Sequence, residues 1–204
     1  MSSLDQALTE GIAHLREACD VMEQLIERHR PPQLSPVPPE RYFDVLVCSI
    51  VGQQLSVKAA DTIEARLREL VGELTPARLL AADEDDLRSV GLSRSKVTYA
   101  RGLADAFHSG HIDPHGLEQA DDPTIRETLI ALKGIGPWTA EMFMIFGLGH
   151  LDVWSPGDLG LRRAVEHFFG EYRDDIAERW RPYRSIAAWY LWEHSDGLVG
   201  RNVT

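Results

Sequence analysis

The chain has 204 residues, 44% of them hydrophobic and 26% charged, which suits one generous domain or two small lobes that share a core. No apolar run approaches the roughly 20 residues that cross a bilayer, and the polar, acidic N-terminus resembles neither a signal peptide nor a transit peptide. We therefore expect a cytoplasmic protein without a membrane partner. The net charge of −11 argues against a nonspecific DNA binder, because phosphate neutralisation normally supplies most of the affinity of such proteins. It does not exclude a protein with a small, local phosphate-binding face.

The two cysteines, Cys19 and Cys48, lie in helical-looking segments and make no metal-ligand spacing. We expect two buried, reduced thiols. Four-cysteine iron–sulfur and zinc sites are excluded by count alone.

Helical periodicity runs through almost the whole sequence. An apolar stripe with a spacing of 3.6 residues predicts a first helix over residues 4–29. Residues 31–39 hold five of the eleven prolines and predict an extended connector. Another apolar stripe begins at Tyr42 and is interrupted at Gly52, and the next begins at about Ser56.

Capping residues, prolines and glycines mark the remaining helix boundaries. They predict helices that start at Thr75-Pro76, cover 83–90 before Gly91, run from Ser93 to about His108, open at Pro123 toward Leu132, and cover about 159–169 and 183–194. There is no convincing alternating strand pattern and no internal repeat. The predicted fold class is therefore all-α.

The segment Leu132–Gly136 (LKGIG) joins two helical patterns. Glycines at both ends of a tight hairpin allow positive φ and a close approach of the backbone to a ligand. Pro137 then suits the first position of the following helix, whose unpaired N–H groups favour an anion. The segment predicts a phosphate contact that does not read base sequence. The alternative is an ordinary αα-hairpin whose glycines only turn the chain.

Three motifs carry a resemblance to a known family. LKGIGPWTAEMF and the PGDLGL that follows it resemble the helix-hairpin-helix (HhH-GPD) DNA glycosylase superfamily. The upstream SIVGQQLSVKAADTI resembles its 3-methyladenine DNA glycosylase II branch. The resemblance covers about residues 42–194. It implies two helical lobes with the active-site cleft between them, and a division into an N-terminal helix and connector (1–37) that pack on a glycosylase domain (38–204).

By this resemblance Asp158 is the catalytic carboxylate. Breaking an N-glycosidic bond builds oxocarbenium character on the deoxyribose, which a nearby carboxylate stabilises. A helix N-terminus favours the charged carboxylate. The alternative, from the residues alone, is that Asp158 only caps the helix that follows it.

The resemblance also bears on strand cleavage. Members of the superfamily that cut the strand use an amine nucleophile at the second position after the hairpin glycine. This chain has Trp138 there, and its lysines are Lys58, Lys96 and Lys133. A monofunctional glycosylase without lyase activity is therefore implied.

Aromatic side chains are available to hold the target base, because alkylated purines carry positive charge that an electron-rich wall attracts. Trp138 and Trp192 match pocket positions of the family, and Trp154, Trp189 and Tyr190 are weaker candidates. For any single one, the alternative is core packing.

Gln54 fits the family position of the side chain that fills the gap left by a flipped base, and Leu55 is the neighbouring candidate. The alternative is a solvated turn between helices. The implied DNA-binding residues are Gln53, Gln54, Leu55, Lys133, Gly134, Ile135, Gly136 and Thr139. Backbone carbonyls of Leu132 and Ile135 are candidates to bind Na⁺ or K⁺.

One departure from the family lies before the aspartate. Relatives usually have an aromatic residue followed directly by proline, with the proline three positions before the aspartate. Here the order is Trp154-Ser155-Pro156-Gly157-Asp158, so the proline stands one place later.

We therefore expect a monomeric, monofunctional enzyme that excises alkylated purines of the 3-methyladenine and 7-methylguanine type from duplex DNA, as in base excision repair. No cofactor and no iron–sulfur cluster is expected, and in a prokaryote the enzyme would associate with the nucleoid. The alternatives are a glycosylase of the same fold for uracil, etheno or deaminated bases, and a noncatalytic DNA-binding helix-hairpin-helix protein.

Overall fold

A computed structural model describes residues 3–195, and this part of the chain is built from helices and loops without a strand. The all-α prediction is confirmed for these residues. None of the helices in this range combines the length and the apolar character that a membrane span requires.

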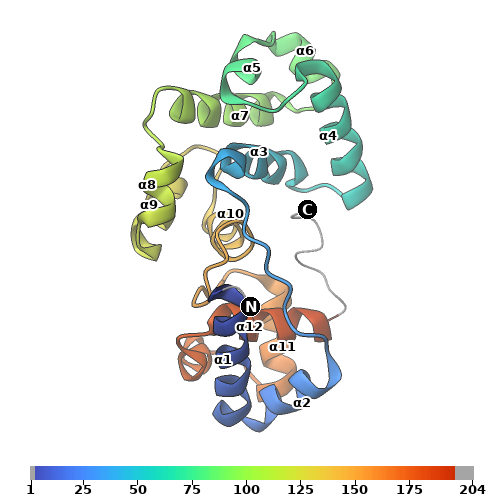
Figure 1. Cartoon of the computed structure of the whole chain (residues 1–204). Helices are drawn as coiled ribbons and strands as arrows, with labels where there is room; N and C mark the ends of the chain where they lie inside the picture. The colour runs from blue at the N-terminus through green and yellow to red at the C-terminus, as the bar shows by residue number, and fades with distance from the viewer. Residues whose placement is uncertain (1–2, 196–204) are drawn as a thin grey trace. The chain divides into compact units, whose positions relative to one another are not determined.

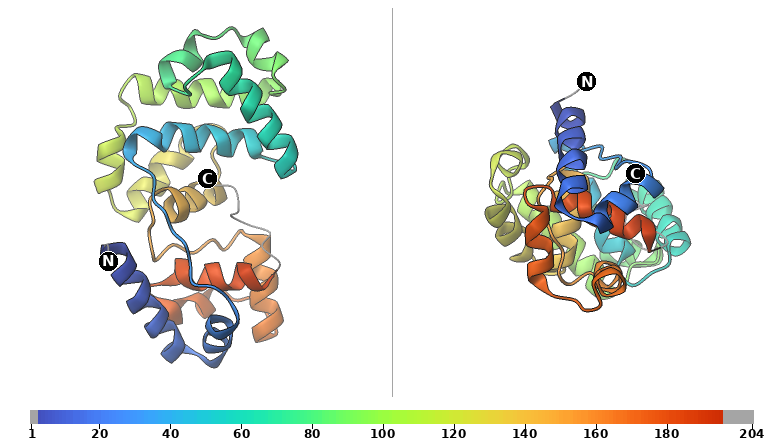
Figure 2. Two further views of the ribbon diagram at one scale, coloured as in Figure 1. Left: turned by 45° about the vertical axis from the view of Figure 1, so that its right-hand side comes forward. Right: turned by 90° about the horizontal axis from the view of Figure 1, so that it is seen from below.

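The described residues form two compact units, which we call the central unit (37–143) and the terminal unit (3–36 with 144–195). Figures 1 and 2 show that α7 lies along α3 within the central unit, and α5 packs against α7. The central unit contains η1 (Pro39–Arg41), α3 (Tyr42–Gly52), α4 (Val57–Val71), α5 (Pro76–Ala81), α6 (Glu84–Ser89), α7 (Arg94–His108), α8 (Pro114–Gln119), α9 (Asp122–Ile130) and α10 (Pro137–Met142).

The terminal unit brings residues 3–36 and 144–195 together around one buried helix. That helix, α12, contacts α1, α2, α11 and η3. The terminal unit contains α1 (Ser3–Ala18), α2 (Asp20–Arg28), α11 (Leu159–Phe169), η3 (Asp174–Trp180) and α12 (Arg184–His194), and the π-helix η2 (Phe143–Gly147) crosses from the central unit into it. One boundary between the units, between residues 36 and 37, lies one residue from the expected domain boundary, and a second lies between residues 143 and 144. The expected division into two domains stays a prediction.

The helix starts predicted at Thr75 and Ser93 are confirmed, and Ser56, where an apolar stripe was expected to begin, is also an N-cap. The side chains of Ser56, Thr75 and Ser93 each accept a hydrogen bond from a backbone N–H in the first turn of the helix that follows. This is the expected geometry of an N-cap, which satisfies one of the orphan donors of a helix. The connector after α2 is extended up to Pro39, where the short η1 begins.

The prediction of a single helix over 4–29 is wrong, because the helix is interrupted at Cys19. Cys19 has extended dihedral angles (φ −168°, ψ 151°), and its carbonyl accepts the N–H groups of Met22 and Glu23 to start α2. The apolar stripe continues across the break, so periodicity alone does not reveal it. Helix α8 and the π-helix η2 were also not predicted.

Helix α1 approaches α12 closely at a glycine. A Cβ placed on Gly11 would overlap the end of Ile186 and would lie 2.7 Å from Cδ1 of Tyr183. Gly11 is buried, so the missing side chain is what allows this contact.

We predict that Gly11→Ala lowers the free energy of unfolding by about 1–3 kcal/mol, because the added methyl group overpacks the contact between α1 and α12. Gly102 provides the matched control, since it is exposed within α7 and has nothing within 4 Å of its Cβ position. Gly102→Ala should instead stabilise the fold by about 0.5–1 kcal/mol. Urea unfolding of both variants measures this, and equal effects would refute the close contact.

Candidate functional site

The hairpin Leu132–Gly136 connects α9 to α10 in the central unit. Ile135 donates its backbone N–H to the carbonyl of Leu132 (3.1 Å) and buries its side chain. Gly134 has φ +98°, a conformation that glycine adopts without strain. A Cβ on Gly134 would also overlap the ring of Tyr99, which extends from α7. Gly134 is therefore required by both its backbone angle and its neighbour.

Gly136 is a different case, because its φ of −91° suits any residue and nothing lies within 4 Å of its Cβ position. It is the N-cap of α10, with Pro137 at the first helical position as predicted. Space around an N-cap without a side chain leaves the backbone open to a ligand, which agrees with the predicted phosphate contact.

The other predicted residues of this region differ in exposure. Lys133 is exposed and Trp138 is 43% exposed, whereas Thr139 is buried in α10. A buried Thr139 is more suited to supporting the hairpin than to contacting DNA through its side chain. The carbonyl of Leu132 accepts the hydrogen bond from Ile135 that closes the turn, and the cation site stays a prediction.

Residues Gly52–Leu55, which we call the wedge turn, begin at the last residue of α3. Gln54 and Leu55 are exposed, as expected for side chains that would enter DNA. Gln53 points elsewhere: its side-chain amide donates to the carbonyl of Gly134 at 2.8 Å. The structure thus joins the wedge turn to the hairpin, although the two are 81 positions apart in the sequence.

Asp158 lies in the terminal unit and is the N-cap of α11. Its Oδ1 accepts the backbone N–H of Leu161 at 2.7 Å and the indole N–H of Trp192 at 3.0 Å. Only 4% of Asp158 is exposed. The capping interpretation is confirmed, but it does not compete with catalysis, because N–H donors and a helix N-terminus both stabilise negative charge on the carboxylate.

Gly160 lies beside the hydrogen bond between Trp192 and Asp158. A Cβ on Gly160 would lie 3.1 Å from Oδ1 of Asp158 and 3.5 Å from Cδ1 of Trp192. Trp192 is buried and its ring lies 5.8 Å from that of Phe146. Its indole therefore holds the carboxylate, a role that the prediction of a pocket wall did not include.

The weaker aromatic candidates lie in the same unit. Tyr190 is buried, and burial raises the pKa of its phenol. The ring of Trp154 lies 5.5 Å from that of Trp180, and the ring of Trp189 lies 6.3 Å from that of Phe146. These contacts suit core packing, and a pocket role for the three residues stays a prediction.

The displaced proline occupies a local turn. Asp158 donates its backbone N–H to the carbonyl of Ser155 at 3.1 Å, which closes a turn over residues 155–158. Pro156 then stands at the second position of this turn, where its fixed φ is favoured. Ser155 takes the place of the family proline and is fully buried.

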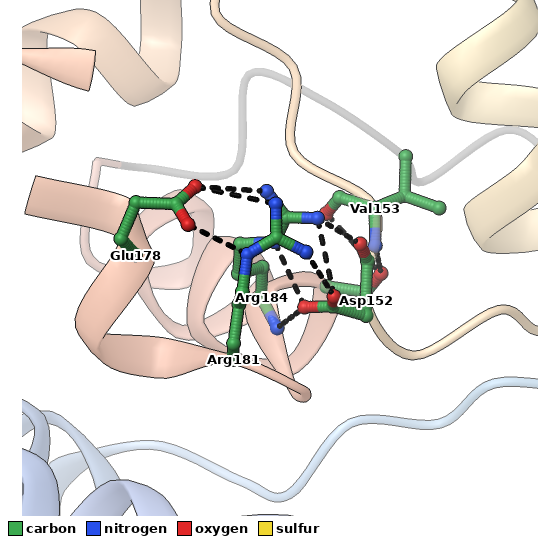
Figure 3. A network of polar contacts seen from close by, with 6 residues as sticks. Asp152, Val153, Glu178, Arg181 and Arg184 are labelled. Atoms are coloured by element: carbon green, nitrogen blue, oxygen red, sulfur yellow. Dashed lines mark hydrogen bonds and ion pairs between the residues drawn. The ribbon is translucent and has the colours of Figure 1, made fainter. Parts of the chain in front are cut away.

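The segment before this turn is tied to the start of α12, as Figure 3 shows. The guanidinium of Arg184 donates to both carboxylate oxygens of Asp152 (2.8 and 3.1 Å) and to its carbonyl (2.7 Å). Arg181 adds a bond to the Asp152 carboxylate at 2.8 Å, and Glu178 pairs with both arginines. This network fixes the chain six residues before Asp158.

Ser185 completes the attachment. Its hydroxyl accepts the N–H of Val153 at 2.9 Å and contacts the Val153 carbonyl at 3.3 Å, while its own N–H donates to the carbonyl of Leu151 at 2.9 Å. No signal in the sequence predicts these contacts, because the partners are 32 and 34 positions apart and none belongs to a motif.

We predict that Arg184→Met lowers the free energy of unfolding by about 2 kcal/mol, because it removes several charge-assisted hydrogen bonds from a side chain that is only 14% exposed. Arg181→Met is the matched control. Its side chain is 49% exposed, so its loss should cost less than about 1 kcal/mol. Equal values in urea unfolding would show that Arg184 does not anchor this segment.

No three His, Cys, Asp or Glu side chains gather to hold a metal ion within residues 3–195. The hairpin and wedge turn belong to the central unit, and Asp158 and Trp192 to the terminal unit. The cleft expected between two lobes stays a prediction.

Comparison with known proteins identifies similar chains over almost the full length. The alkylbase DNA glycosidase-like protein mag2 of Schizosaccharomyces pombe is 28% identical, over 94% of this chain and 95% of that protein. A crystal structure of a DNA-3-methyladenine glycosidase from Bacillus halodurans is 39% identical, with a TM-score of 0.82 over 91% of this chain and 88% of that one.

A third similar protein is the 3-methyladenine DNA glycosylase Mag1 of Schizosaccharomyces pombe, solved in complex with abasic DNA. It is 28% identical, with a TM-score of 0.80 over 92% of this chain and 97% of that one. Residues 47–181, more than half of the chain, match the family described as HhH-GPD superfamily base excision DNA repair protein. This chain therefore belongs to the HhH-GPD superfamily of base excision DNA repair proteins.

Proposed function

We propose that this protein is a monofunctional DNA glycosylase that excises alkylated purines from duplex DNA. The observation that carries the proposal is the buried carboxylate of Asp158, held by the N–H of Leu161 and the indole of Trp192. The similar proteins support it, since they are named as glycosylases or glycosidases of 3-methyladenine or alkylated bases. The partner is DNA, and Mag1 was solved with abasic DNA, the product that base excision leaves.

The reaction breaks the bond between C1′ of the deoxyribose and the base nitrogen. The bonding electrons leave with the cationic alkylated purine, which departs as a neutral base. Positive charge then develops on C1′ and the ring oxygen, and Asp158 stabilises it. A water molecule adds to C1′ and loses one proton, which leaves an abasic site. Because the leaving group already carries a positive charge, a single carboxylate suffices without a general acid.

Trp138 supports the monofunctional assignment. It occupies the position at which strand-cutting members carry their amine nucleophile, and an indole cannot form a Schiff base. Its 43% exposed ring is available instead to a cationic base. The backbone around Gly136 is the proposed phosphate contact, Gln54 or Leu55 the proposed wedge, and the enzyme is proposed to act as a monomer without a cofactor.

We predict that Asp158→Asn lowers the rate of base release at least about a hundredfold, because it removes the charge that stabilises the oxocarbenium ion. The fold should survive, since an amide oxygen still accepts the bonds from Leu161 and Trp192. Asp85→Asn is the control, because that carboxylate is 97% exposed on α6 of the central unit. The rate of 7-methylguanine release is measured under single-turnover conditions for the wild type and both variants.

The same assay tests the remaining parts of the proposal. Duplexes that each hold one lesion are incubated with wild-type protein and analysed before and after alkali. Cleavage only after alkali is expected, with 7-methylguanine or 3-methyladenine as substrate. Cleavage before alkali would contradict the monofunctional assignment. Release of only uracil, etheno or deaminated bases would favour the related-glycosylase alternative, and binding without release would favour the noncatalytic one.

A pair of glycine variants tests the hairpin. Gly136→Ala should leave the stability unchanged, because its φ is ordinary and the Cβ position is open. It should weaken binding to an abasic-site duplex about tenfold by obstructing a phosphate hydrogen bond worth roughly 1.5 kcal/mol. Gly134→Ala should instead destabilise the fold by about 1–3 kcal/mol. Thermal unfolding and fluorescence anisotropy measure the two effects, and unchanged DNA affinity in Gly136→Ala would argue against this phosphate site.

A further inference from the structure

Lys96 is one of three lysines in the chain, and no catalytic role falls to it. It lies in the first turn of α7, next to the N-cap Ser93. Its Nζ donates to the carbonyls of Val51 and Gln53, both at 2.7 Å. The last carbonyls of a helix have no partner within the helix, and these two belong to the end of α3. The amine is thus committed to the backbone of the wedge turn.

The bond to Gln53 acts on the shape of that turn. Gln53 has φ −52° and ψ 127°, Gln54 has φ +59°, and Leu55 donates its N–H to the carbonyl of Gly52 at 3.1 Å. These are the features of a type II β-turn, in which the third residue requires positive φ and is usually glycine. Among the described residues, Gln54 is the one non-glycine with such an angle.

Type I and type II turns differ mainly in the orientation of their central peptide. Here that peptide joins Gln53 to Gln54, and its plane is rigid. Lys96 holds its carbonyl oxygen, so it opposes the rotation that would return Gln54 to negative φ. A residue with a side chain loses about 1 kcal/mol of stability when it adopts positive φ. The free energy of a charge-assisted hydrogen bond is large enough to offset this loss. Burial, which lowers the pKa of Lys96, is consistent with an amine directed inward.

Gln53 extends the connection to the hairpin. Its side-chain amide donates to the carbonyl of Gly134, which fixes the peptide plane between Gly134 and Ile135. Tyr99, which lies three residues after Lys96 and so on the same face of α7, packs its ring against Gly134. One face of α7 therefore supports both elements that are proposed to contact DNA.

We propose that Lys96 is a positioning residue that holds the wedge turn in its type II form and, through Gln53, aligns the turn with the hairpin for DNA binding. This proposal rests on the proposed function, because it assigns DNA contacts to both elements. Lys96 itself makes no phosphate contact in it. Its positive charge serves two backbone carbonyls of the protein.

The test compares Lys96→Met, Lys96→Arg and the control Lys58→Met, which removes the same charge from an exposed position in α4. Each protein is titrated with an abasic-site duplex and with the undamaged duplex at several salt concentrations. Lys96→Met should bind the abasic-site duplex about tenfold more weakly with little change on undamaged DNA. Lys96→Arg keeps donors for both carbonyls and should retain most of the affinity, and Lys58→Met should match the wild type.

The salt dependence separates positioning from a direct phosphate contact. Loss of one phosphate contact lowers the slope of log affinity against log salt by about one. The slope of Lys96→Met should equal that of the wild type. A reduced slope, or wild-type affinity for the abasic-site duplex, would overturn the proposal. A 2-aminopurine beside the abasic site reports disturbance of the base stack by its fluorescence. The change in its fluorescence on binding should be smaller for Lys96→Met than for the wild type, because a misplaced Gln54 no longer disturbs the neighbouring stack.

Gln53→Leu provides a second variant that keeps the proposal testable if Lys96→Met does not fold. It removes the amide donor to Gly134 and should weaken abasic-site binding without changing the salt slope. Unchanged binding in Gln53→Leu would overturn the connection to the hairpin. In the double variant the combined loss should be smaller than the product of the single losses, because both act through one turn. Independent effects would contradict this coupling.

These measurements use binding alone, so they are separate from the proposed reaction. Wild-type protein that binds the abasic-site duplex but releases no base would refute the glycosylase function. The comparison of Lys96 variants would still decide the positioning role.

Discussion

A helix leaves its first N–H groups and its last C=O groups without partners inside the helix, and three of the candidate sites of the chain lie at such helix ends. At the start of α11, Asp158 satisfies the N–H of Leu161. At the end of α3, Lys96 satisfies the carbonyls of Val51 and Gln53. The open backbone at the start of α10 is where a phosphate is expected. Helix ends thus gather the side chains and backbone groups that are proposed to act in chemistry and binding.

This constraint explains why a structural and a functional interpretation coincide at Asp158. A cap must lie at the helix end and accept N–H donors, and a catalytic carboxylate benefits from the same donors. The additional bond from Trp192 lies beside Gly160, where a Cβ would stand only 3.1 Å from Oδ1 of Asp158. Capping a helix does not require an indole donor. The indole bond is therefore the feature that distinguishes Asp158 from the ordinary caps at Ser56 and Ser93.

Much of the fold could be predicted from the sequence because local signals mark most helix boundaries. Thr75 with Pro76 is one such boundary, and the stretch 159–169 has the same bounds as α11. The break at Cys19 has no such signal, since the apolar stripe runs through it. Family motifs located Asp158 and the hairpin, but contacts between distant positions were beyond them. The bonds from Gln53 to Gly134 and from Arg184 to Asp152 depend on tertiary packing, which no motif in one sequence encodes.

The acidic composition of the chain explains why contacts that hold the backbone in position matter for the proposed DNA binding. With a net charge of −11, the chain cannot rely on a general attraction to phosphates. Its affinity for DNA must come from a few donors in fixed positions. Such a donor keeps its position only when the backbone that carries it is itself held in place. A lysine bound to backbone carbonyls adds nothing to the attraction, yet it preserves the geometry of the turn and hairpin. Under the proposed function, selectivity for a distorted duplex would come from these positioned contacts, because nonspecific binding to undamaged DNA is weak.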